Sequence, residues 1–383
     1  MVIKCASLYI ILAIILVLVS ADVVSQTFTP EMVNLISDQM QRSNLYADDD
    51  FTRFFVVGDF GDLDNLSGVD NMTNIMSELA SEKPFHFVTT VGDNFYPKGI
   101  ETMDDLQNAN KVMSYFQKPD IKDIKIYPTL GNHDCYSDYT NEVKFSEFKS
   151  QWRMESDYYE LKEPLKDDPS KYVVILMSNS CLLMCWSINE ADQKAHKTCN
   201  KMNTEVGSQR VKEHYFWLEH KLQTYSTDPN AVWVGVAMHH PVLKEVPLKN
   251  DLLPLLQKYK VDFALVGHTH IYEYSNFGYD ESLRYPNEAK GPVLDDCGAD
   301  IEIYNTANIE HYFKKGEMFH QILVGTSGTE LDKICPYHDQ DGEVYFQSID
   351  GHGLVTIEAN SQDLRISYYK DKDIPFFSIE ITV

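Results

Sequence analysis

Five short apolar runs, each ending in a cluster of polar side chains, constrain the fold of this 383-residue chain more than any other feature. The runs are continuously apolar rather than alternating, which is typical of strands that are covered on both faces in a layered α/β architecture. They are RFFVVGDFGD (53–62), HFVTTVGDNFY (86–96), IKIYPTLGNHD (124–134), AVWVGVAMHHP (231–241) and VDFALVGHTH (261–270). Functional groups in open α/β sheets gather at the carboxyl ends of strands, so we expect the five clusters to form one site.

Helical patterns separate these runs, and further strands follow them. The helices are expected at 72–82, 103–117 and 211–225, and the strands at 321–328, in a hairpin at 353–370 and at 376–382. Residues 150–205 and 275–318 show no clear periodicity. A composition of 43% hydrophobic and 24% charged residues indicates a globular protein. We therefore expect a lead-in over 22–50 and one large α/β domain over 51–383.

Residues 1–21 have the pattern of a cleaved secretory signal. One cation, Lys4, precedes an apolar stretch that ends in small residues at Ser20 and Ala21. The alternative is an uncleaved anchor, which needs about 20 apolar residues, and Asp22 ends the run too early for that. The sequence thus predicts entry into the secretory pathway and a mature chain without a transmembrane anchor.

The cysteines and two glycosylation triplets also fit a protein of the secretory pathway. An even number of cysteines remains after the signal, and spacing alone selects none of the 15 possible pairings. These cysteines are Cys135, Cys181, Cys185, Cys199, Cys297 and Cys335. Asn65 and Asn71 begin Asn-X-Ser/Thr triplets, which mark candidate glycosylation sites in a lumenal protein and also occur by chance.

The formal net charge of −25 excludes the basic footprint that nucleic-acid binding needs. The same charge repels anionic substrates at long range. A site that handles phosphate therefore needs local positive charge, and bound metal ions supply it.

The polar residues at the five strand ends form an ordered set. They are Asp59, then Asp93 with Tyr96, Asn132 with His133, His239 with His240, and His268 with His270. A single Gly-Asp turn or a single strand histidine is usually structural, whereas this succession is not explained by chance. The series resembles the calcineurin-like metallophosphoesterases, which hold two metal ions with a bridging carboxylate. The resemblance implies a four-layer α/β/β/α sandwich with the metals at the carboxyl ends of the strands.

Two metal ions suit phosphate ester hydrolysis, which is among the slowest uncatalysed reactions. Cations about 3.5–4 Å apart generate hydroxide as the nucleophile and neutralise charge on both the attacking and the leaving oxygen. Imidazole and amide ligands carry no charge, so the centre stays net positive toward phosphate.

Tyr96 narrows the resemblance. Many metallophosphoesterases place a histidine two residues after the first aspartate, and that position is Gly61 here. A phenolate from Tyr96 would replace the histidine, and a hard anionic oxygen favours Fe³⁺ over Zn²⁺. The alternative is that Tyr96 packs beside Pro97. The motifs GDFG, GDNFY, GNHD, His before x-Pro, and GHTH together resemble the purple acid phosphatases, more narrowly the small tartrate-resistant type.

This resemblance, from about Arg53 to the C-terminus, implies a ligand set and an activity. The ferric ion would be held by Asp59, Tyr96 and His270, and Asp93 would bridge. The divalent ion, Fe(II) or Zn(II), would be held by Asn132, His239 and His268. His133 would orient the substrate or protonate the leaving group. The implied protein is an acid phosphatase for small phosphomonoesters or phosphoproteins, secreted or kept in an acidic lysosome- or vacuole-like compartment.

Three features depart from the family pattern. Asp62 adds a negative charge near the first motif, which is expected to weaken phosphate binding. In the pair His239-His240 either histidine is a possible ligand; alignment on the following proline favours His239 and leaves His240 to face the substrate. An insertion around 276–318 is longer than small family members need, and is either a lid, a docking surface or a loop without function.

Two other functions stay open on sequence grounds. One is a catalytically weak scaffold or binding protein on a phosphatase fold, with structural metals. The other is a metallophosphoesterase of different specificity, acting on nucleotides, cyclic diesters or phosphoproteins without ferric iron. The presence of every implied ligand favours the active phosphatase.

Overall fold

Two seven-stranded sheets form the centre of the part of the chain that the structure describes. The structure is a computed structural model, and it describes residues 50–185, 207–279, 310–332, 344–371 and 374–383. The elements given below belong to the unit Phe51–Val383. The predicted signal, nearly all of the lead-in, the centre of the insertion, and Cys199, Cys297 and Cys335 lie outside the described residues.

The first sheet runs in the order β3 (Lys125–Pro128), β2 (Phe87–Thr90), β1 (Thr52–Val57), β12 (Leu354–Ala359), β13 (Asp363–Tyr369), β14 (Phe377–Thr382) and β9 (Glu310–Lys314). The second runs in the order β11 (Val344–Ser348), β8 (Tyr272–Gly278), β10 (Met318–Val324), β7 (Phe263–Val266), β6 (Ala231–Ala237), β5 (Tyr172–Met177) and β4 (Tyr159–Pro164). The five strands predicted to carry polar clusters are therefore present as β1, β2, β3, β6 and β7, and the predicted hairpin is β12–β13.

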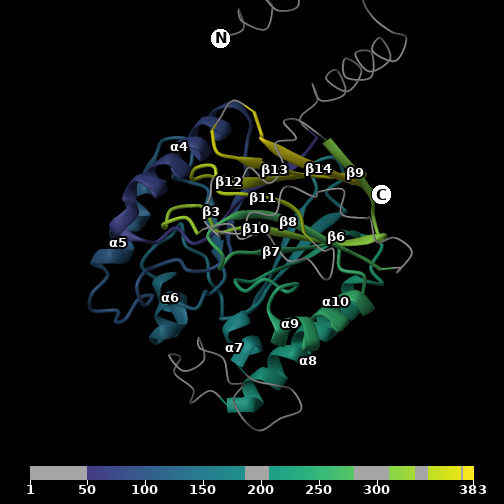
Figure 1. The fold of residues 1–383 in the computed structure, drawn as a ribbon, viewed down its shortest axis with the longest axis horizontal. Coiled ribbons are helices and arrows are strands. Elements are labelled where there is room, and N and C mark those ends of the chain that lie inside the picture. The colour runs from purple at the N-terminus through teal and green to yellow at the C-terminus, as the bar shows by residue number, and fades with distance from the viewer. Residues whose placement is uncertain (1–49, 186–206, 280–309, 333–343, 372–373) are drawn as a thin grey trace, which may run out of the picture. The chain divides into compact units, whose positions relative to one another are not determined.

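The helices lie on the outer faces of the two sheets. They are α4 (Leu66–Glu82), α5 (Gln107–Ser114), α6 (Thr140–Phe145), α7 (Ser180–Cys185), α8 (Gly207–Tyr225), α9 (Val246–Asp251) and α10 (Leu253–Lys258). Short 3-10 helices span Leu63–Asn65, Tyr115–Gln117 and Asp134–Tyr136. Figure 1 shows α4 and α5 on one side of the sheets and α8, α9 and α10 on the other, which confirms the expected α/β/β/α sandwich.

Strand β5 shows why the apolar runs do not alternate. Val173, Ile175 and Met177 pack into the core between the two sheets. Val174 and Leu176 face the other way and pack under α8 and its neighbours. Successive side chains of a strand point to opposite faces, and both faces are covered here, so every position of β5 is buried and apolar.

The structure differs from the sequence expectations in the two segments without clear periodicity. Strands β4 and β5 lie within 150–205, and β8, β9 and the start of β10 occupy the two ends of the predicted insertion. Residues 172–177 form a continuous apolar run of the same kind as the five predicted strands, so the sequence signal for β5 was present although 150–205 as a whole shows no periodicity.

Parallel pairing sets the position of the functional loops. In the first sheet Val57 pairs with Thr90, and Thr90 pairs with Pro128. In the second sheet Ala237 pairs with Leu265. The carboxyl ends of these strands therefore end at the same level, and the loops that follow them lie next to one another.

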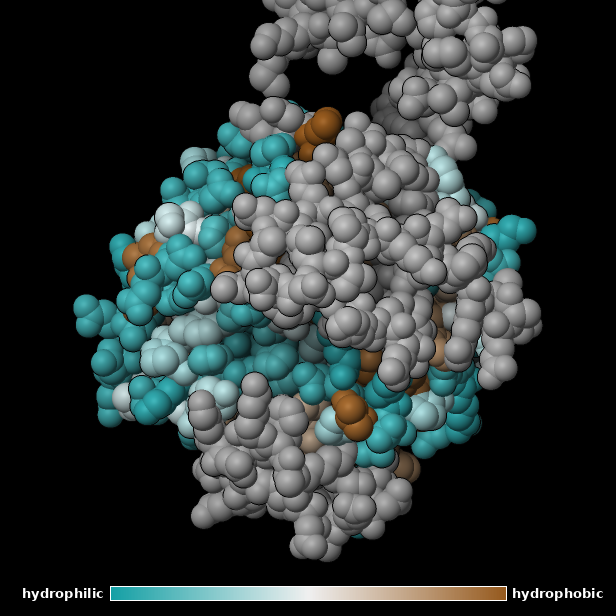
Figure 2. All heavy atoms as spheres, in the orientation of Figure 1, coloured by the Kyte–Doolittle hydropathy of each residue, from teal (hydrophilic) through white to brown (hydrophobic). Residues whose placement is uncertain are grey.

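The described helices and surface have two further properties. Among the described residues, none of the helices combines the length and the apolar character that crossing a bilayer requires. Hydrophilic side chains cover most of the described surface on the face drawn in Figure 2, as the acidic composition suggests.

A buried histidine in α8 makes folding stability depend on pH. The ring of His214 stacks on Tyr158, with ring centroids 4.2 Å apart. Burial, aided by the charge of Arg210, lowers the pKa of His214 to about 3. An unfolded histidine has a pKa of about 6.5. The unfolded chain therefore binds the extra proton between these values, and the contribution of His214 is fully present above pH ~6.5 and is lost as the pH falls.

We expect His214→Phe, which keeps the stacked ring, to remove this dependence. As the pH falls from about 6 to about 4, the free energy of unfolding of the wild type should decrease relative to that of the variant by up to about 1.4 kcal/mol per pH unit. Urea unfolding at several pH values measures the difference. His220→Phe, at an exposed position of the same helix, serves as the control and should follow the wild type. Parallel pH profiles for His214→Phe and wild type would contradict the assignment.

Candidate metal centre

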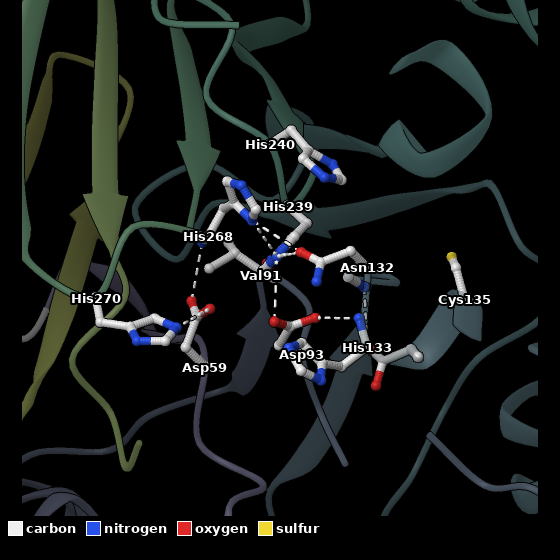
Figure 3. Close-up of polar contacts among 12 residues, drawn as sticks. Asp59, Val91, Asp93, Asn132, His133, Cys135, His239, His240, His268 and His270 are labelled. Carbon is white, nitrogen blue, oxygen red and sulfur yellow. Dashed lines mark hydrogen bonds and ion pairs between the residues drawn. The ribbon is translucent and has the colours of Figure 1, made fainter. Parts of the chain in front are cut away.

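Loops after β1, β2, β3, β6 and β7 bring the predicted site residues together at one edge of the sandwich (Figure 3). Three of them have left-handed backbones, with φ of 57° at Asp59, 51° at Asp93 and 74° at His268. Non-glycine residues rarely adopt this conformation, and they concentrate where a site demands it. The sharp turn at each strand end directs the side chain into the centre rather than along the sheet.

Asp59, Tyr96 and His270 form the first group of donors. The Tyr96 hydroxyl lies 3.5 Å from Asp59 Oδ1 and 3.4 Å from His270 Nε2. Asp59 Oδ1 and His270 Nε2 are 3.6 Å apart. These are the three residues that the resemblance assigns to a ferric ion.

Asn132, His239 and His268 form the second group. Asn132 Oδ1 lies 3.0 Å from His239 Nε2 and 2.8 Å from His268 Nδ1. The two imidazole nitrogens are 3.2 Å apart. These are the residues that the resemblance assigns to the divalent ion.

Asp93 lies between the two groups. Its Oδ1 accepts a hydrogen bond of 2.8 Å from the backbone N–H of His133. Its Oδ2 lies 3.1 Å from the Tyr96 hydroxyl and 3.4 Å from His239 Nε2. Because one oxygen is held by the backbone, the other faces a donor of each group, which is the placement a bridging carboxylate needs.

Hydrogen bonds to carbonyl oxygens orient two of the histidines. His239 Nδ1 lies 2.8 Å from the Val91 carbonyl oxygen, and His270 Nδ1 lies 2.9 Å from that of Glu330. A carbonyl only accepts, so each Nδ1 carries a hydrogen, and Nε2 is the nitrogen that faces the centre and would bind a metal ion. Metal-binding histidines are usually oriented in this way.

Glycines make room for the carboxylates. A Cβ at position 131 would lie 2.2 Å from Asp93 Oδ1, and a Cβ at position 267 would lie 2.5 Å from Asp59 Oδ2. Both contacts are far shorter than atoms allow, so Gly131 and Gly267 are required where these carboxylates approach the backbone.

Burial perturbs the acidic groups of the centre. Burial raises the pKa of Asp59 well above its usual range, and Asp93 adds to the shift. Burial also acts on Asp93, but the neighbouring His239 outweighs it, and the pKa of Asp93 is lowered. The pKa of His239 is in turn raised to about 9, because the attraction of Asp93 and Asp59 overcomes the cost of burial.

Burial and neighbouring carboxylates also perturb Tyr96. Burial and the charge of Asp93 raise its pKa well above the usual range, so the phenol keeps its proton in the protein alone. Buried anionic donors at this density need a compensating cation. Carboxylate, phenol, amide and imidazole donors are ligands that suit iron and zinc, so the residues present fit a pair of metal ions.

The two histidines without a ligand assignment differ in exposure. His133 is partly exposed at the rim, where Nδ1 lies 2.8 Å from the Pro97 carbonyl oxygen and the ring contacts Tyr96. His240 is fully buried, and its Nδ1 lies 2.8 Å from Ser180 Oγ. A fully buried ring suits a positioning role, and the predicted contact of His240 with a substrate stays a prediction.

Asp62 and the two glycosylation triplets have structural surroundings. Asp62 Oδ1 accepts a hydrogen bond of 3.0 Å from the Asp64 backbone, and Oδ2 accepts one of 3.0 Å from the Thr329 hydroxyl, so both oxygens are engaged. Asn65 is the residue before α4, and Asn71 is exposed within that helix, where its Nδ2 donates to the His352 carbonyl. Their glycosylation stays a prediction.

Asp134 is a supporting residue to which sequence reasoning gave no role. Its buried carboxylate accepts backbone hydrogen bonds from Gly131 at 2.8 Å, Asn94 at 3.0 Å and Phe95 at 3.1 Å. Burial, together with the charge of Asp93, raises its pKa to about 6. It thus joins the loop that carries Asp93 to the loop that carries Asn132. The sequence signal that could have indicated this role is the position of Asp134 as the last residue of the GNHD motif.

Comparisons with known proteins agree with this geometry. The sequence profile described as calcineurin-like phosphoesterase matches residues 52–272. Tartrate-resistant acid phosphatase type 5 of Oryctolagus cuniculus is 24% identical over 236 residues, which cover 58% of this chain and 68% of that protein. The protein of the same name from Sus scrofa is 25% identical over 232 residues, covering 58% and 65%. The chain thus spans about two thirds of the length of these relatives.

Two solved structures share the fold. GAP50, the anchor in the inner membrane complex of Plasmodium, has a TM-score of 0.62 at 14% identity, covering 87% of this chain and 89% of that one. Purple acid phosphatase PPD1 from seeds of yellow lupin (Lupinus luteus) has a TM-score of 0.55 at 18% identity, covering 87% and 54%.

The hydrogen bonds of Asp134 lead to a prediction about metal binding. Both of its oxygens accept from N–H groups, so in Asp134→Asn either orientation of the amide sets an NH₂ against a backbone donor. We expect the variant to fold but to bind metal about 10–100-fold more weakly, as is usual when a group that orients the ligands is lost. Metal content after dialysis against graded chelator measures the change. Asp138→Asn, whose amide oxygen still caps Thr140, is the control, and equal retention in both variants would refute the role.

Proposed function

This chain belongs to the calcineurin-like phosphoesterase family, and we propose that it is an acid phosphatase that hydrolyses phosphate monoesters at a binuclear centre. The observation that carries the proposal is the position of the Tyr96 hydroxyl, within 3.5 Å of Asp93, Asp59 and His270 side chains. A tyrosine that only packed beside Pro97 would not need to direct its hydroxyl into a cluster of metal-binding groups. This position supports Fe(III) at the first group.

The proposed ligand assignment follows the two groups of donors. Asp59, Tyr96 and His270 would hold Fe(III), and Asn132, His239 and His268 would hold Fe(II) or Zn(II). Asp93 would be the carboxylate shared by the two ions. When bound, the ions activate water as the nucleophile and neutralise charge on the phosphate oxygens. A trivalent and a divalent ion exceed the charge of two carboxylates and one phenolate, so the centre attracts phosphate despite the acidic chain.

The partly exposed His133 is the residue proposed to contact the substrate. The Pro97 carbonyl only accepts, so His133 Nδ1 donates to it and the ring is fixed at the rim of the centre. Nε2 is then available to hold or donate a proton. We propose that it orients the phosphate or protonates the leaving oxygen, as a general acid must reach the atom that it serves.

We also propose a cellular compartment and a class of substrate. A disulfide joins Cys135 and Cys181, and structural disulfides persist in oxidising compartments. Together with the predicted signal over 1–21 and the candidate glycosylation sites, it supports a secreted protein or one in an acidic lumenal compartment. A small phosphomonoester or a phosphoprotein is the proposed substrate.

Two alternatives remain to be tested against this proposal. The Plasmodium structure is described as an anchor, so the fold itself is compatible with a scaffold as well as with an enzyme. A phosphoesterase of other specificity, without ferric iron, would share every ligand except the Tyr96 phenolate. The partly exposed His133 beside the converging donor groups favours catalysis over a scaffold, because structural metal sites are closed by their ligands and need no group placed to meet a substrate.

Visible absorption tests the ferric site. We expect the protein purified with iron to show a phenolate-to-Fe(III) charge-transfer band that is absent in Tyr96→Phe. Tyr127→Phe, a change in β3 outside the centre, is the control and should keep the band. A colourless protein that binds metal and hydrolyses phosphoesters would point to the other specificity, and a protein without turnover would point to the scaffold.

Kinetics test His133. We expect His133→Ala to keep both metals and the visible band while kcat for a phosphomonoester falls by about 10²–10⁴, the usual loss of general acid–base assistance. Metal content by mass spectrometry and kcat from initial rates provide the readouts. Loss of a metal ion in this variant would instead make His133 a ligand and overturn the assignment.

A further inference from the structure

Ser180 contacts the histidine pair His239-His240. It begins α7, directly after β5, and the parallel register of β5 and β6 pairs Met177 with Ala237. Residues after the two strands are therefore neighbours. Ser180 Oγ accepts hydrogen bonds from the backbone N–H groups of His239 at 3.2 Å and His240 at 3.1 Å.

The same hydroxyl also fixes the ring of His240. Ser180 Oγ lies 2.8 Å from His240 Nδ1. A hydroxyl has one hydrogen, and two N–H groups already donate to this oxygen, so the hydrogen goes to Nδ1. Ser180 is fully buried, and all its hydrogen-bonding capacity is directed at the loop that carries His239.

The next residue ties α7 to another ligand loop. Cys181 forms the disulfide with Cys135, and both side chains are buried. The Cys135 N–H donates to the Gly131 carbonyl at 3.1 Å, and Cys181 Sγ lies 3.2 Å from the same oxygen. Gly131 directly precedes Asn132, so the disulfide is anchored at the backbone of that ligand; Figure 3 shows Cys135 on this side of the centre.

These contacts hold the second group of donors and not the first. Asn132 and His239 are two of the three residues proposed for the divalent ion. The first group is held by other contacts, including Thr329 N–H to the Asp59 carbonyl at 2.9 Å and Tyr96 N–H to the Gly61 carbonyl at 3.1 Å. The hydrogen bonds of the Ser180 hydroxyl and the Cys135–Cys181 disulfide do not reach Asp59, Tyr96 or His270.

We propose that Ser180 and the Cys135–Cys181 disulfide, together called the α7 clasp, position Asn132 and His239 so that the second metal ion binds tightly only after the disulfide has formed. The inference rests on the proposed binuclear centre and assigns its regulation. Ser180 acts as a positioning residue, since it touches neither metal nor substrate.

The clasp links metal loading to oxidative folding. Disulfides form in the lumen of the secretory pathway and are rare in the cytosol. The first site fills independently of the disulfide, whereas the second, and with it phosphatase turnover, waits for an oxidising compartment. The chain is thus kept from hydrolysing phosphoesters before it reaches that compartment.

Zinc titration of Ser180→Ala tests the proposal with the disulfide intact. The iron-loaded protein is stripped of its second ion and titrated with Zn²⁺, with bound zinc measured by mass spectrometry and the visible band recorded. We expect the zinc concentration at half-saturation to rise about 10–100-fold while the ferric band is unchanged. Ser178→Ala is the matched control, because Ser178 is buried two residues earlier and its hydroxyl donates to Leu176.

The double variant Cys135→Ala/Cys181→Ala tests the disulfide in the same titration. Weak zinc binding with a retained ferric band is the expected result. Wild-type zinc affinity in Ser180→Ala, or equal loss of both metals from a variant whose circular dichroism is native, would overturn the proposal. Absence of the ferric band from the wild type would refute the proposed ferric site separately, and zinc titration of that protein would still rank the variants and decide on the clasp.

Discussion

The Asp93 carboxylate is the contact on which the rest of the centre depends. One oxygen is fixed by the backbone of His133, and the other lies between Tyr96 and His239. Such an arrangement requires β2 to end beside both β1 and β3, and the first sheet to meet the second at the same edge. The parallel registers satisfy the first requirement. For the second, the His268 N–H donates to Asp59 Oδ2 at 3.1 Å and so joins the loops of the two sheets. The two-sheet architecture is therefore the means by which one carboxylate reaches two groups of donors.

The loops around Asp93 bury two further carboxyl groups, those of Asp134 and Glu142, and burying a charged group is unfavourable. Asp134 joins the loop that carries Asp93 to the loop that carries Asn132, because its carboxylate accepts hydrogen bonds from the backbone N–H groups of Asn94 and Gly131. Glu142 lies further back, where Asn94 Nδ2 donates to it at 3.1 Å, and burial together with Asp134 raises its pKa well above the usual range. Backbone and side-chain N–H groups donate to these outer acids, whereas Asp59 and Asp93 face the other donors of the two groups.

How far the sequence predicted the molecule can be judged from particular residues. The strand-end motifs predicted β1, β2, β3, β6 and β7, and the donors they carry do converge. By contrast, β5 was not expected, although it positions Ser180. Its sequence is a continuous apolar run like the other five, but the Ser178-Asn179-Ser180 that follows carries no carboxylate or imidazole to mark a site, and its place in the sheet follows only from pairing with its neighbours. Asp134 and Ser180 act through hydrogen bonds with backbone groups of other loops, which their own motifs do not indicate.

The sequence by itself determined which chemical groups are available and in what order they follow the strands, because motif and strand end are local properties. It also places a glycine, not a histidine, two residues after Asp59 and a tyrosine three residues after Asp93. Only the tertiary structure decided which oxygen of Asp93 faces both groups, that His240 is buried on Ser180, and that Cys135 pairs with Cys181. These are contacts between residues far apart in the chain, and they depend on strand register and packing, which no local pattern encodes.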